Sequence, residues 1–570
     1  MRIKMKFQRY FWLVLFLAAA QAASAQRTLE EQINVVRAYR PILADAVKIK
    51  KNPELSDTSQ VRPQLEYLVT DEKLSDNSNP GPVPAKQPRA VTSHYAPYLY
   101  GKAGAGNLGG VLAEIYFNNK QDENNQYGLF LQHHSAKGDL DYQQYGRTAL
   151  GGFGKFNVGS RASVNVSAAY RQRGNRIASI TPVTNPDPLD PILEGDDTST
   201  IKQRFNLLEG EVEIANLRTT SSDFVYGLKL GGYTLSDEFE SKENNFYLTG
   251  LVGKQFGTFS INLAGNIDMT NLDFASTADT QAFSVKNPVY RFQPYLLFKN
   301  GSITFKGGIN LVGISDENAF QGIDKKLFLF PDISVDFQLI PEYLALFGGV
   351  SGDVVKNTIR EFSEENSYMR QFGKLTNSRE KYNVFAGIRG SFSSSVGFKA
   401  QFEYANVDYQ NFIINDTLNR REFEIYNAGE NGKRTTVNAE LNVRYSEAFR
   451  MNLGLWSYKY EDDFILRAWN VPTLKLYISP TYNYRDKLFL TANLFYVGER
   501  NAYLGTSGAA GSTYQVLDPY TDLNFGASYK INTNFGVFLN ANNVLNKQYE
   551  QYLNYRTIGF NMVGGLTFTL

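Results

Sequence analysis

The sequence contains no cysteine and only three histidines in 570 residues. The absence of cysteine excludes disulfide bonds, thiol catalysis, thiolate metal sites and the lipid attachment of a lipoprotein. The histidines are His94, His133 and His134. Adjacent residues on a strand point to opposite faces, so His133 and His134 cannot bind one metal ion or share a proton. Chemistry that depends on cysteine or on paired histidines is therefore not expected.

An excess of charge of either sign is also lacking. The 58 Lys and Arg residues balance 57 Asp and Glu residues, which leaves a net charge of +1. Without a basic stripe we expect no nucleic acid partner. Beyond residue 20 no apolar run approaches the ~18 residues of a membrane helix. If the chain enters a membrane, it therefore does so as strands.

The N-terminus has the pattern of a signal peptide. Four basic residues among the first nine precede an apolar run at residues 11–20, and the small residues Ala23, Ser24 and Ala25 follow. The alternative, a membrane anchor, is disfavoured because the apolar run is too short to span ~30 Å of hydrocarbon. We expect residues 1–25 to direct secretion and to be removed.

The next residues differ from the rest of the chain. Residues 26–78 are charged and mixed, with Pro41 and Pro53 interrupting any regular element, and we interpret them as a periplasmic N-terminal segment. Residues 79–95 contain the proline-rich stretch NPGPVPAKQPRA, which is typical of an extended linker. The remaining residues, 96–570, form the fourth predicted unit.

Residues 96–570 alternate between apolar and polar side chains. In TVNAELNVRY, residues 436–445, Val437 and Leu441 share one face, while Glu440 and Arg444 share the other. Either a soluble sheet or a membrane barrel could produce this period of two. The runs are longer than average soluble strands and carry rows of charge on the polar face, as in a water-filled lumen. Tyrosines such as Tyr170, Tyr404 and Tyr445 end several runs, as interface girdles do. We therefore predict an all-β fold, a transmembrane antiparallel β-barrel.

Connection lengths support this prediction. Short turns alternate with long polar loops near residues 173–202, 272–286, 313–325, 356–380, 409–431, 499–518 and 547–557. Short periplasmic turns and long external loops are typical of outer-membrane barrels, and the pairing gives roughly 22 strands, with 20 and 24 left open. An even number places both ends of the barrel on the periplasmic side.

The C-terminal segment GFNMVGGLTFTL is predicted to be the closing strand. Its lipid-facing row comprises Phe560, Met562, Leu566, Phe568 and Leu570. This strand must pair with the first strand, near residues 97–106, because an open edge in lipid would leave backbone groups unsatisfied.

The last fifty residues resemble the closing hairpins of TonB-dependent receptor barrels of the Bacteroidota type. The similar elements are NANNVLNKQYEQY, residues 540–552, and the strand that ends in GLTFTL. The resemblance implies an outer-membrane barrel of a Gram-negative bacterium that takes up a ligand with energy passed through the periplasm. Members of this family carry a globular plug, which residues 26–95 are too short and too proline-interrupted to match.

A wide barrel without a plug needs another closure, since the interior widens with strand number. Infolded loops, the N-terminal tail or another protein could supply it, and loops 173–202 and 356–380 are the longest candidates. The residues expected to face the lumen include Glu209, Glu211, Glu213, Lys399, Glu403, Glu440 and Arg444.

The tail segment EEQINVVRAYRP, residues 30–41, resembles the short box that such receptors offer to a periplasmic energy-transducing partner. Such a box adds a strand to the partner's sheet. The predicted docking residues are Ile33, Val35, Val36, Arg37, Tyr39, Arg40 and Pro41. An amphipathic helix or a solvated tail is the alternative interpretation.

We predict no catalytic, metal-binding or cofactor-binding residues. The acidic segments 186–197 and 460–464 could bind Ca²⁺ through carboxylate oxygens, but neither has the spacing of a calcium loop. The favoured function is non-enzymatic: transport across the outer membrane, or the barrel subunit of a transport-associated complex. The alternative is a scaffold barrel whose tail and external loops recruit periplasmic proteins and a surface lipoprotein, in addition to the surrounding membrane lipids.

Overall fold

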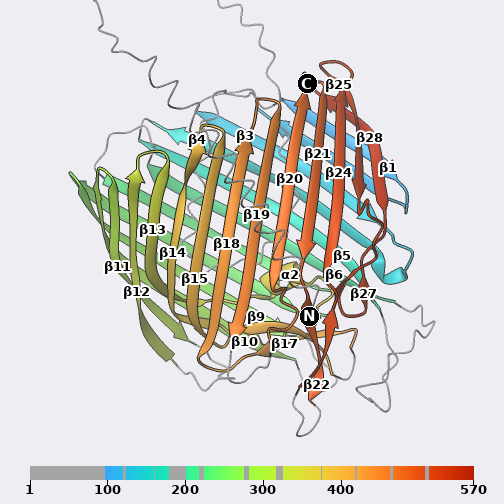
Figure 1. Cartoon of the computed structure of the whole chain (residues 1–570). Coiled ribbons are helices and arrows are strands. Elements are labelled where there is room, and N and C mark those ends of the chain that lie inside the picture. Colours follow the sequence, from blue (N-terminus) through green and yellow to red (C-terminus); the bar gives the residue numbers. More distant parts are fainter. Residues whose placement is uncertain are drawn as a thin grey trace, which may run out of the picture. The chain divides into compact units, whose positions relative to one another are not determined.

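The computed structural model (Figure 1) describes most of the chain from residue 97 onwards. The described residues are 97–119, 124–159, 161–178, 200–216, 224–274, 282–315, 325–370, 372–373, 375–417, 420–461, 467–506 and 512–570. The predicted signal peptide, tail segment and linker lie outside them, as do the acidic segment 186–197 and most of loop 173–202.

One antiparallel sheet of 22 strands forms a closed barrel. Each strand pairs with its neighbours in the sequence, and the first strand pairs with the last. The strands are β1 (Leu99–Gly106), β2 (Val111–Asn118), β3 (Asn125–Ala136), β4 (Tyr145–Val158), β5 (Ala162–Ala178), β6 (Thr200–Asn216), β7 (Phe224–Ser236), β8 (Lys242–Phe256), β9 (Phe259–Phe274), β10 (Phe283–Asn300), β11 (Ile303–Ser315), β12 (Lys325–Ile340), β13 (Leu344–Val355), β14 (Ser378–Ser393), β15 (Val396–Asp408), β18 (Gly432–Arg444), β19 (Phe449–Glu461), β20 (Leu474–Tyr484), β21 (Leu488–Val497), β24 (Tyr520–Lys530), β25 (Phe535–Asn542) and β28 (Asn561–Thr569). The predicted fold class and the strand number are confirmed.

The alternation in the sequence explains the two faces of the barrel wall. On β6, Leu208 is 54% exposed on the outer face, while its neighbour Glu209 points to the opposite face. Strand β12 likewise exposes Leu327 and Leu329. Exposed aliphatic side chains in rows are suited to hydrocarbon, and a closed sheet satisfies every backbone group within the bilayer.

The barrel closes between β1 and β28. Strand β28, the predicted closing strand, pairs with β25 on one side and with β1 on the other. Phe560, Met562, Leu566 and Leu570 are exposed, and Phe568 is half-buried. Gly565 lies against the backbone of Ala103 so closely that a Cβ atom at this position would overlap it. Glycine is therefore required where the two ends of the sheet meet.

Short and long connections alternate around most of the barrel, as predicted, but connections 107–110 and 237–241 at the long-loop end are short. Turns 257–258, 301–302 and 394–395 lie at one end, and segments 356–377 and 409–431 lie at the other. Three of the predicted loops also contain short hairpins: β16 (Asn411–Asn415) with β17 (Phe423–Asn427), β22 (Arg500–Thr506) with β23 (Ser512–Leu517), and β26 (Glu550–Tyr552) with β27 (Tyr555–Arg556). Within the described ranges the helices are η1 (Asp141–Gln143) and α2 (Ile359–Glu365).

Strand lengths vary widely around the barrel. Strands β5 and β6 have 17 residues each and β10 has 18, whereas β1 and β2 have eight. Tyr170 therefore lies within β5 and not at its end. Among the described residues no helix has the length and the apolarity needed to cross a bilayer.

Candidate functional site at the long-loop end of the barrel

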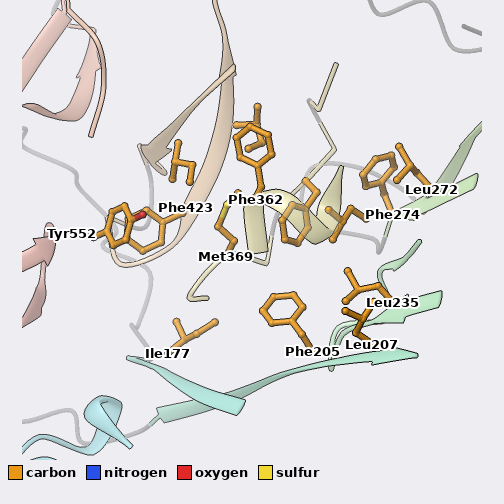
Figure 2. Packing of buried hydrophobic residues seen from close by; sticks show 14 of the residues in the cluster. Ile177, Phe205, Leu207, Leu235, Leu272, Phe274, Phe362, Met369, Phe423 and Tyr552 are labelled. Atoms are coloured by element: carbon orange, nitrogen blue, oxygen red, sulfur yellow. The ribbon is translucent and has the colours of Figure 1, made fainter. Parts of the chain in front are cut away.

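The largest buried apolar cluster lies at the long-loop end (Figure 2), where α2 and the short hairpins β16–β17 and β26–β27 are found. Its members come from the inner face of the wall and from three connections: Ile177, Phe205, Leu207, Leu235, Leu272, Phe274, Ile359, Phe362, Met369, Phe372, Ile413, Phe423, Ile425, Tyr552 and Tyr555. We call the described residues of segment 356–377, hairpin β16–β17 and hairpin β26–β27 the mouth closure. Because Leu207 has the parity opposite to lipid-exposed Leu208, the closure packs on the lumen side of the wall.

Helix α2 gives the closure its apolar face. Thr358 caps the helix, and its Oγ1 accepts a hydrogen bond from the backbone N–H of Glu361 at 3.1 Å. Ile359 and Phe362 are three residues apart, so they lie on one face of the helix, and both are buried. The cap and this spacing orient the helix with its apolar side against the wall.

A wall carboxylate holds the start of the helix. Glu243 of β8 is fully buried, and its Oε2 accepts hydrogen bonds from the backbone N–H groups of Ile359 at 2.5 Å and of Arg360 at 3.3 Å. The hydroxyl of Tyr233 on β7 donates to the other oxygen of Glu243. A buried carboxylate is tolerated only with such donors, and two of the three belong to the closure.

Arginine and lysine side chains add two further links to the wall. Arg360 donates to Glu209 at 2.8 Å and lies over the ring of Tyr233, 4.7 Å from its centroid. Lys356, whose side chain is 7% exposed, donates to Asp268 Oδ1 of β9 at 2.6 Å. Burial lowers the pKa of the Lys356 ammonium, and the carboxylate of Asp268 opposes this shift. The ion pair therefore offsets part of the cost of burying the ammonium.

Hydrogen bonds to uncharged acceptors of segment 356–377 complete the attachment. Arg173 of β5 donates from Nη1 to the backbone oxygen of Ser363 at 2.9 Å and from Nη2 to its hydroxyl at 3.0 Å. Gln203 of β6, which is fully buried, donates to the backbone oxygen of Met369 at 2.8 Å. Five neighbouring strands, β5 to β9, therefore all contact segment 356–377.

The three parts of the closure also bind one another. The rings of Tyr368 and Tyr555 stack with centroids 4.1 Å apart, and Tyr552 donates to the backbone oxygen of Glu365 at 3.0 Å. Arg370 pairs with Glu422 at 2.6 Å. Burial raises the pKa of Tyr555 well above its usual range. These contacts join segments far apart in sequence into one packed unit.

The predicted lumen-facing residues fall into two groups. On β6, Glu209 contacts the closure. Glu211 accepts a hydrogen bond from Tyr247 at 2.5 Å and pairs with Lys229 at 3.0 Å, and Glu213 is half-buried. On the other side of the closure, Lys399 of β15 lies opposite Glu440 of β18 in the register. Of the first group, Glu209 contacts the mouth closure through Arg360.

The rest of the second group also lies on β15 and β18. Glu403 accepts a hydrogen bond from Gln401 at 2.7 Å, and Arg444 lies opposite Arg450 of β19. The predicted docking residues of the tail, Ile33, Val35, Val36, Arg37, Tyr39, Arg40 and Pro41, lie outside the described residues.

Sequence reasoning missed the residues that form the closure itself. Ile359, Phe362, Met369 and Phe372 carry a weak signal, since apolar residues recur at helical spacing within a charged segment. Their partners Phe423 and Tyr555 belong to other loops, so no local pattern predicts the contact.

The contacts of the site are hydrogen bonds, ion pairs and ring stacking. Within the described ranges no group of three or more His, Asp or Glu side chains is placed to hold a metal ion. His133 donates to or accepts from Thr148 at 2.9 Å, and His134 bonds Tyr145 at 3.2 Å. Both histidines are thus engaged with wall hydroxyls.

No family model matches the sequence, and no curated protein matches it either. Solved structures are similar in fold. The chain is 10% identical to the FrpB iron transporter from Neisseria meningitidis (F3-3 variant), with a TM-score of 0.63 over 84% of this chain and 82% of that chain. It is 11% identical to the pyoverdine outer membrane receptor FpvA from Pseudomonas aeruginosa PAO1, with a TM-score of 0.58 over 85% and 79%.

A third similar structure is the copper transporter OprC, which is 9% identical with a TM-score of 0.58 over 84% of this chain and 80% of that chain. At these identities the likeness concerns the fold. The chain has the β-barrel fold of TonB-dependent outer-membrane receptors, and the predicted location in the outer membrane of a Gram-negative bacterium agrees with that fold.

Proposed function

We propose that this chain is a non-enzymatic transport barrel of the outer membrane whose mouth is closed by its own loops. The observation that carries the proposal is the attachment of segment 356–377 to the inner wall through Glu243, Arg360 and Lys356. A loop that lies on the inner wall at the mouth controls access to the lumen. Iron, copper and pyoverdine are handled by the proteins of similar fold, which supports transport of a ligand here.

The chemistry of the attachment favours a closure that can open. Replacing buried ion pairs by apolar residues often leaves stability unchanged or raises it, so such pairs are a poor means of making a permanent seal. Discrete polar contacts instead allow two defined arrangements. In one the closure is docked on the inner wall, and in the other it is released and its polar groups are hydrated. A ligand that binds the released loops shifts the balance between these arrangements.

The periplasmic side is part of the same proposal. Residues 26–95 match no plug of the family, so the mouth closure takes over the task of restricting the lumen, as in a Bacteroidota-type barrel without a plug. The segment Ile33–Pro41 docks on a periplasmic protein by adding a strand to its sheet. Deletion of residues 27–50 tests this part: a periplasmic partner that still co-purifies with the shortened chain contradicts it.

Conductance in a planar bilayer tests the transport proposal. The full chain is compared with a variant in which residues 358–375 are replaced by a short Gly-Ser linker. We expect the full chain to be mostly closed and the variant to pass a large steady current. A folded variant that passes no current contradicts the proposal, because the lumen is then blocked by something other than the closure.

A scaffold that recruits a surface lipoprotein through its external loops is the second candidate. The observation that favours it is the packing of three loops into one apolar unit, which presents a fixed surface at the mouth. In that case the linker variant loses its surface partner and stays non-conducting. The same bilayer measurement therefore separates the two functions.

A further inference from the structure

The outer wall of the barrel carries a groove where β9 to β12 reach the long-loop end. Its volume is about 670 Å³, which lies within the roughly 300–1,000 Å³ that ligand sites of proteins occupy. Its apolar part is lined by Met269 of β9, Pro288 and Tyr290 of β10, Gly313 of β11 and Leu327 of β12. Four neighbouring strands therefore build one groove.

The register shows that this groove opens to the bilayer and not to the lumen. Tyr290 lies opposite Gly313, and Gly313 lies opposite Leu327. Residues opposite each other in an antiparallel pair project to the same face of the sheet. Leu327 is 73% exposed and belongs to the row that faces hydrocarbon, so the other two positions face hydrocarbon as well.

A glycine keeps the groove open. A Cβ atom at Gly313 would meet the side chain of Tyr290 at 3.9 Å, which is an ordinary van der Waals contact. The backbone would therefore accept a larger residue at this position, and that residue would occupy the groove. The missing side chain leaves space that the fold of β11 itself does not require.

The position of the groove relative to the bilayer follows from β10. Its outward residues are apolar or aromatic from Pro288 to Phe298. This stretch rises about 33 Å along the strand, or about 23 Å across the bilayer at a tilt near 45°, which is close to the apolar band of about 25 Å in outer-membrane barrels. Lys286 is the next outward residue, so it stands at the level of the headgroups at the long-loop end.

The groove is polar at this upper end. Lys286 and Asn271 lie opposite each other in the register, and both line the groove together with Ser315 at the end of β11. An ammonium, a primary amide and a hydroxyl can all donate hydrogen bonds. Asp273, the next outward residue of β9, lies opposite Lys242 of β8. The outer face of β8 to β10 at this end therefore carries an excess of positive charge.

The neighbouring outer wall is different at the same level. Tyr170 of β5 donates to Asn206 of β6 at 2.9 Å, and Thr234 of β7 donates to Asn244 of β8 at 2.8 Å. Neutral groups of adjacent strands thus bond one another there. The groove instead joins a cation to an apolar surface.

We infer that this groove binds a phosphate-bearing lipid of the outer leaflet, with an acyl chain along Tyr290 and Leu327 and the phosphate at Lys286. An acyl chain buries apolar surface in the lower part, and a phosphate accepts charge-assisted hydrogen bonds in the upper part. A soluble anion would leave the apolar part unfilled, and a neutral lipid would give the ammonium no opposite charge. An anionic amphiphile matches both parts.

The inference goes beyond the proposed transport function and does not depend on it. The groove lies on the lipid face, whereas the mouth closure lies on the lumen side of the wall. A linker variant that conducts, or one that stays closed, leaves the lipid site unaffected.

Native mass spectrometry of the detergent-purified chain provides the test. The chain is titrated with monophosphoryl lipid A and with the same lipid after removal of its phosphate, and inorganic phosphate is added as a competitor. Gly313→Leu fills the groove, and Lys286→Ala removes the cation. The matched control is Gly265→Leu, at an outward glycine in the middle of the apolar band of β9, where a Cβ atom would make its nearest contact at 3.6 Å.

We expect the parent and the Gly265→Leu control to retain one molecule of monophosphoryl lipid A with a saturable affinity. Lys286→Ala and removal of the phosphate should each weaken this affinity by about fivefold, the effect of one lysine at an anionic membrane surface. Gly313→Leu should abolish the saturable binding, and inorganic phosphate should not displace the lipid. Heat-modifiable migration in gel electrophoresis confirms that each variant is folded.

Three results overturn the inference. One is equal retention of the lipid by the folded Gly313→Leu variant and by the Gly265→Leu control. Another is an equal affinity of the parent for the phosphorylated and the dephosphorylated lipid. The third is displacement of the lipid by inorganic phosphate alone, which would assign the site to a soluble anion.

Discussion

Replacement of Glu243 by alanine should release the mouth closure. The carboxylate of Glu243 is fully buried and accepts hydrogen bonds from the N–H groups of Ile359 and Arg360, which belong to the closure. It also accepts the hydroxyl of Tyr233, which belongs to the wall. Only the first two contacts are broken when the closure leaves the wall, so only they bear on the opening equilibrium.

The magnitude follows from these two contacts. A hydrogen bond to a charged group contributes about 1.5–3 kcal/mol net of desolvation. The contact with Arg360 is long, at 3.3 Å, so the low end of the range applies. Two contacts at the low end give about 3 kcal/mol, which raises the ratio of open to closed barrel by about a hundredfold, since 1.4 kcal/mol is a factor of ten.

Single-channel recording in a planar bilayer measures this ratio as an open probability. The matched control is Glu211→Ala, which removes an equal charge from the neighbouring wall, where Glu211 contacts only Tyr247 and Lys229. Heat-modifiable migration in gel electrophoresis confirms that each variant is folded. Equal open probabilities of the Glu243→Ala variant, the control and the parent refute the argument that this carboxylate holds the closure.

Three further predictions concern the closure and the wall. Arg370→Glu and Glu422→Arg should each raise the open probability, because the two side chains form an ion pair at 2.6 Å between two parts of the closure. The double variant should restore the open probability of the parent, and a double variant as open as the single variants contradicts this prediction. Gly565→Ala should lower the midpoint of thermal unfolding because its Cβ atom meets the backbone of Ala103, whereas Gly227→Ala, at an open position in β7, should leave the midpoint unchanged. Leu263→Arg on the outer face of β9 should lower the unfolding free energy in liposomes by about 2–4 kcal/mol. Asn262→Arg on the inner face should lower the unfolding free energy by less, and equal losses for the two variants argue against the assignment of the two faces.

The sequence predicted the barrel because the signal for it is local. In a segment such as 436–445, the alternation of apolar and polar side chains predicts which face of the strand contacts hydrocarbon. This prediction requires no information about residues elsewhere in the sequence. The same alternation predicted that Glu209 lies on the lumen face of its strand, because its neighbour Leu208 lies on the lipid face. It could not identify Arg360 as the partner of Glu209, because the two residues are separated by 151 positions.

Loop 356–380 was a candidate closure on the sequence alone, but the residues that attach it escaped prediction for a related reason. Segment 356–377 is rich in charged and polar residues, so it reads as a solvated loop, although Ile359 and Phe362 lie three apart as on one face of a helix. Their burial depends on Phe205 and Leu272 of the wall and on Phe423 and Tyr552 of other loops. Composition alone predicts that such a segment is solvent-exposed. The burial of its few apolar residues becomes visible only in the folded structure, where the loops meet.

The anions that hold segment 356–377 lie on one side of the lumen. All the wall contacts of segment 356–377 described above lie on β5 to β9, where Glu209, Glu243 and Asp268 provide the anions. The pair of Arg370 with Glu422, which joins the segment to hairpin β16–β17, involves none of these anions. Attachment to the wall and cohesion within the closure should therefore be separable: Glu243→Ala weakens the first and leaves the Arg370–Glu422 pair in place, whereas Arg370→Glu breaks that pair and leaves the anchor at Glu243 in place.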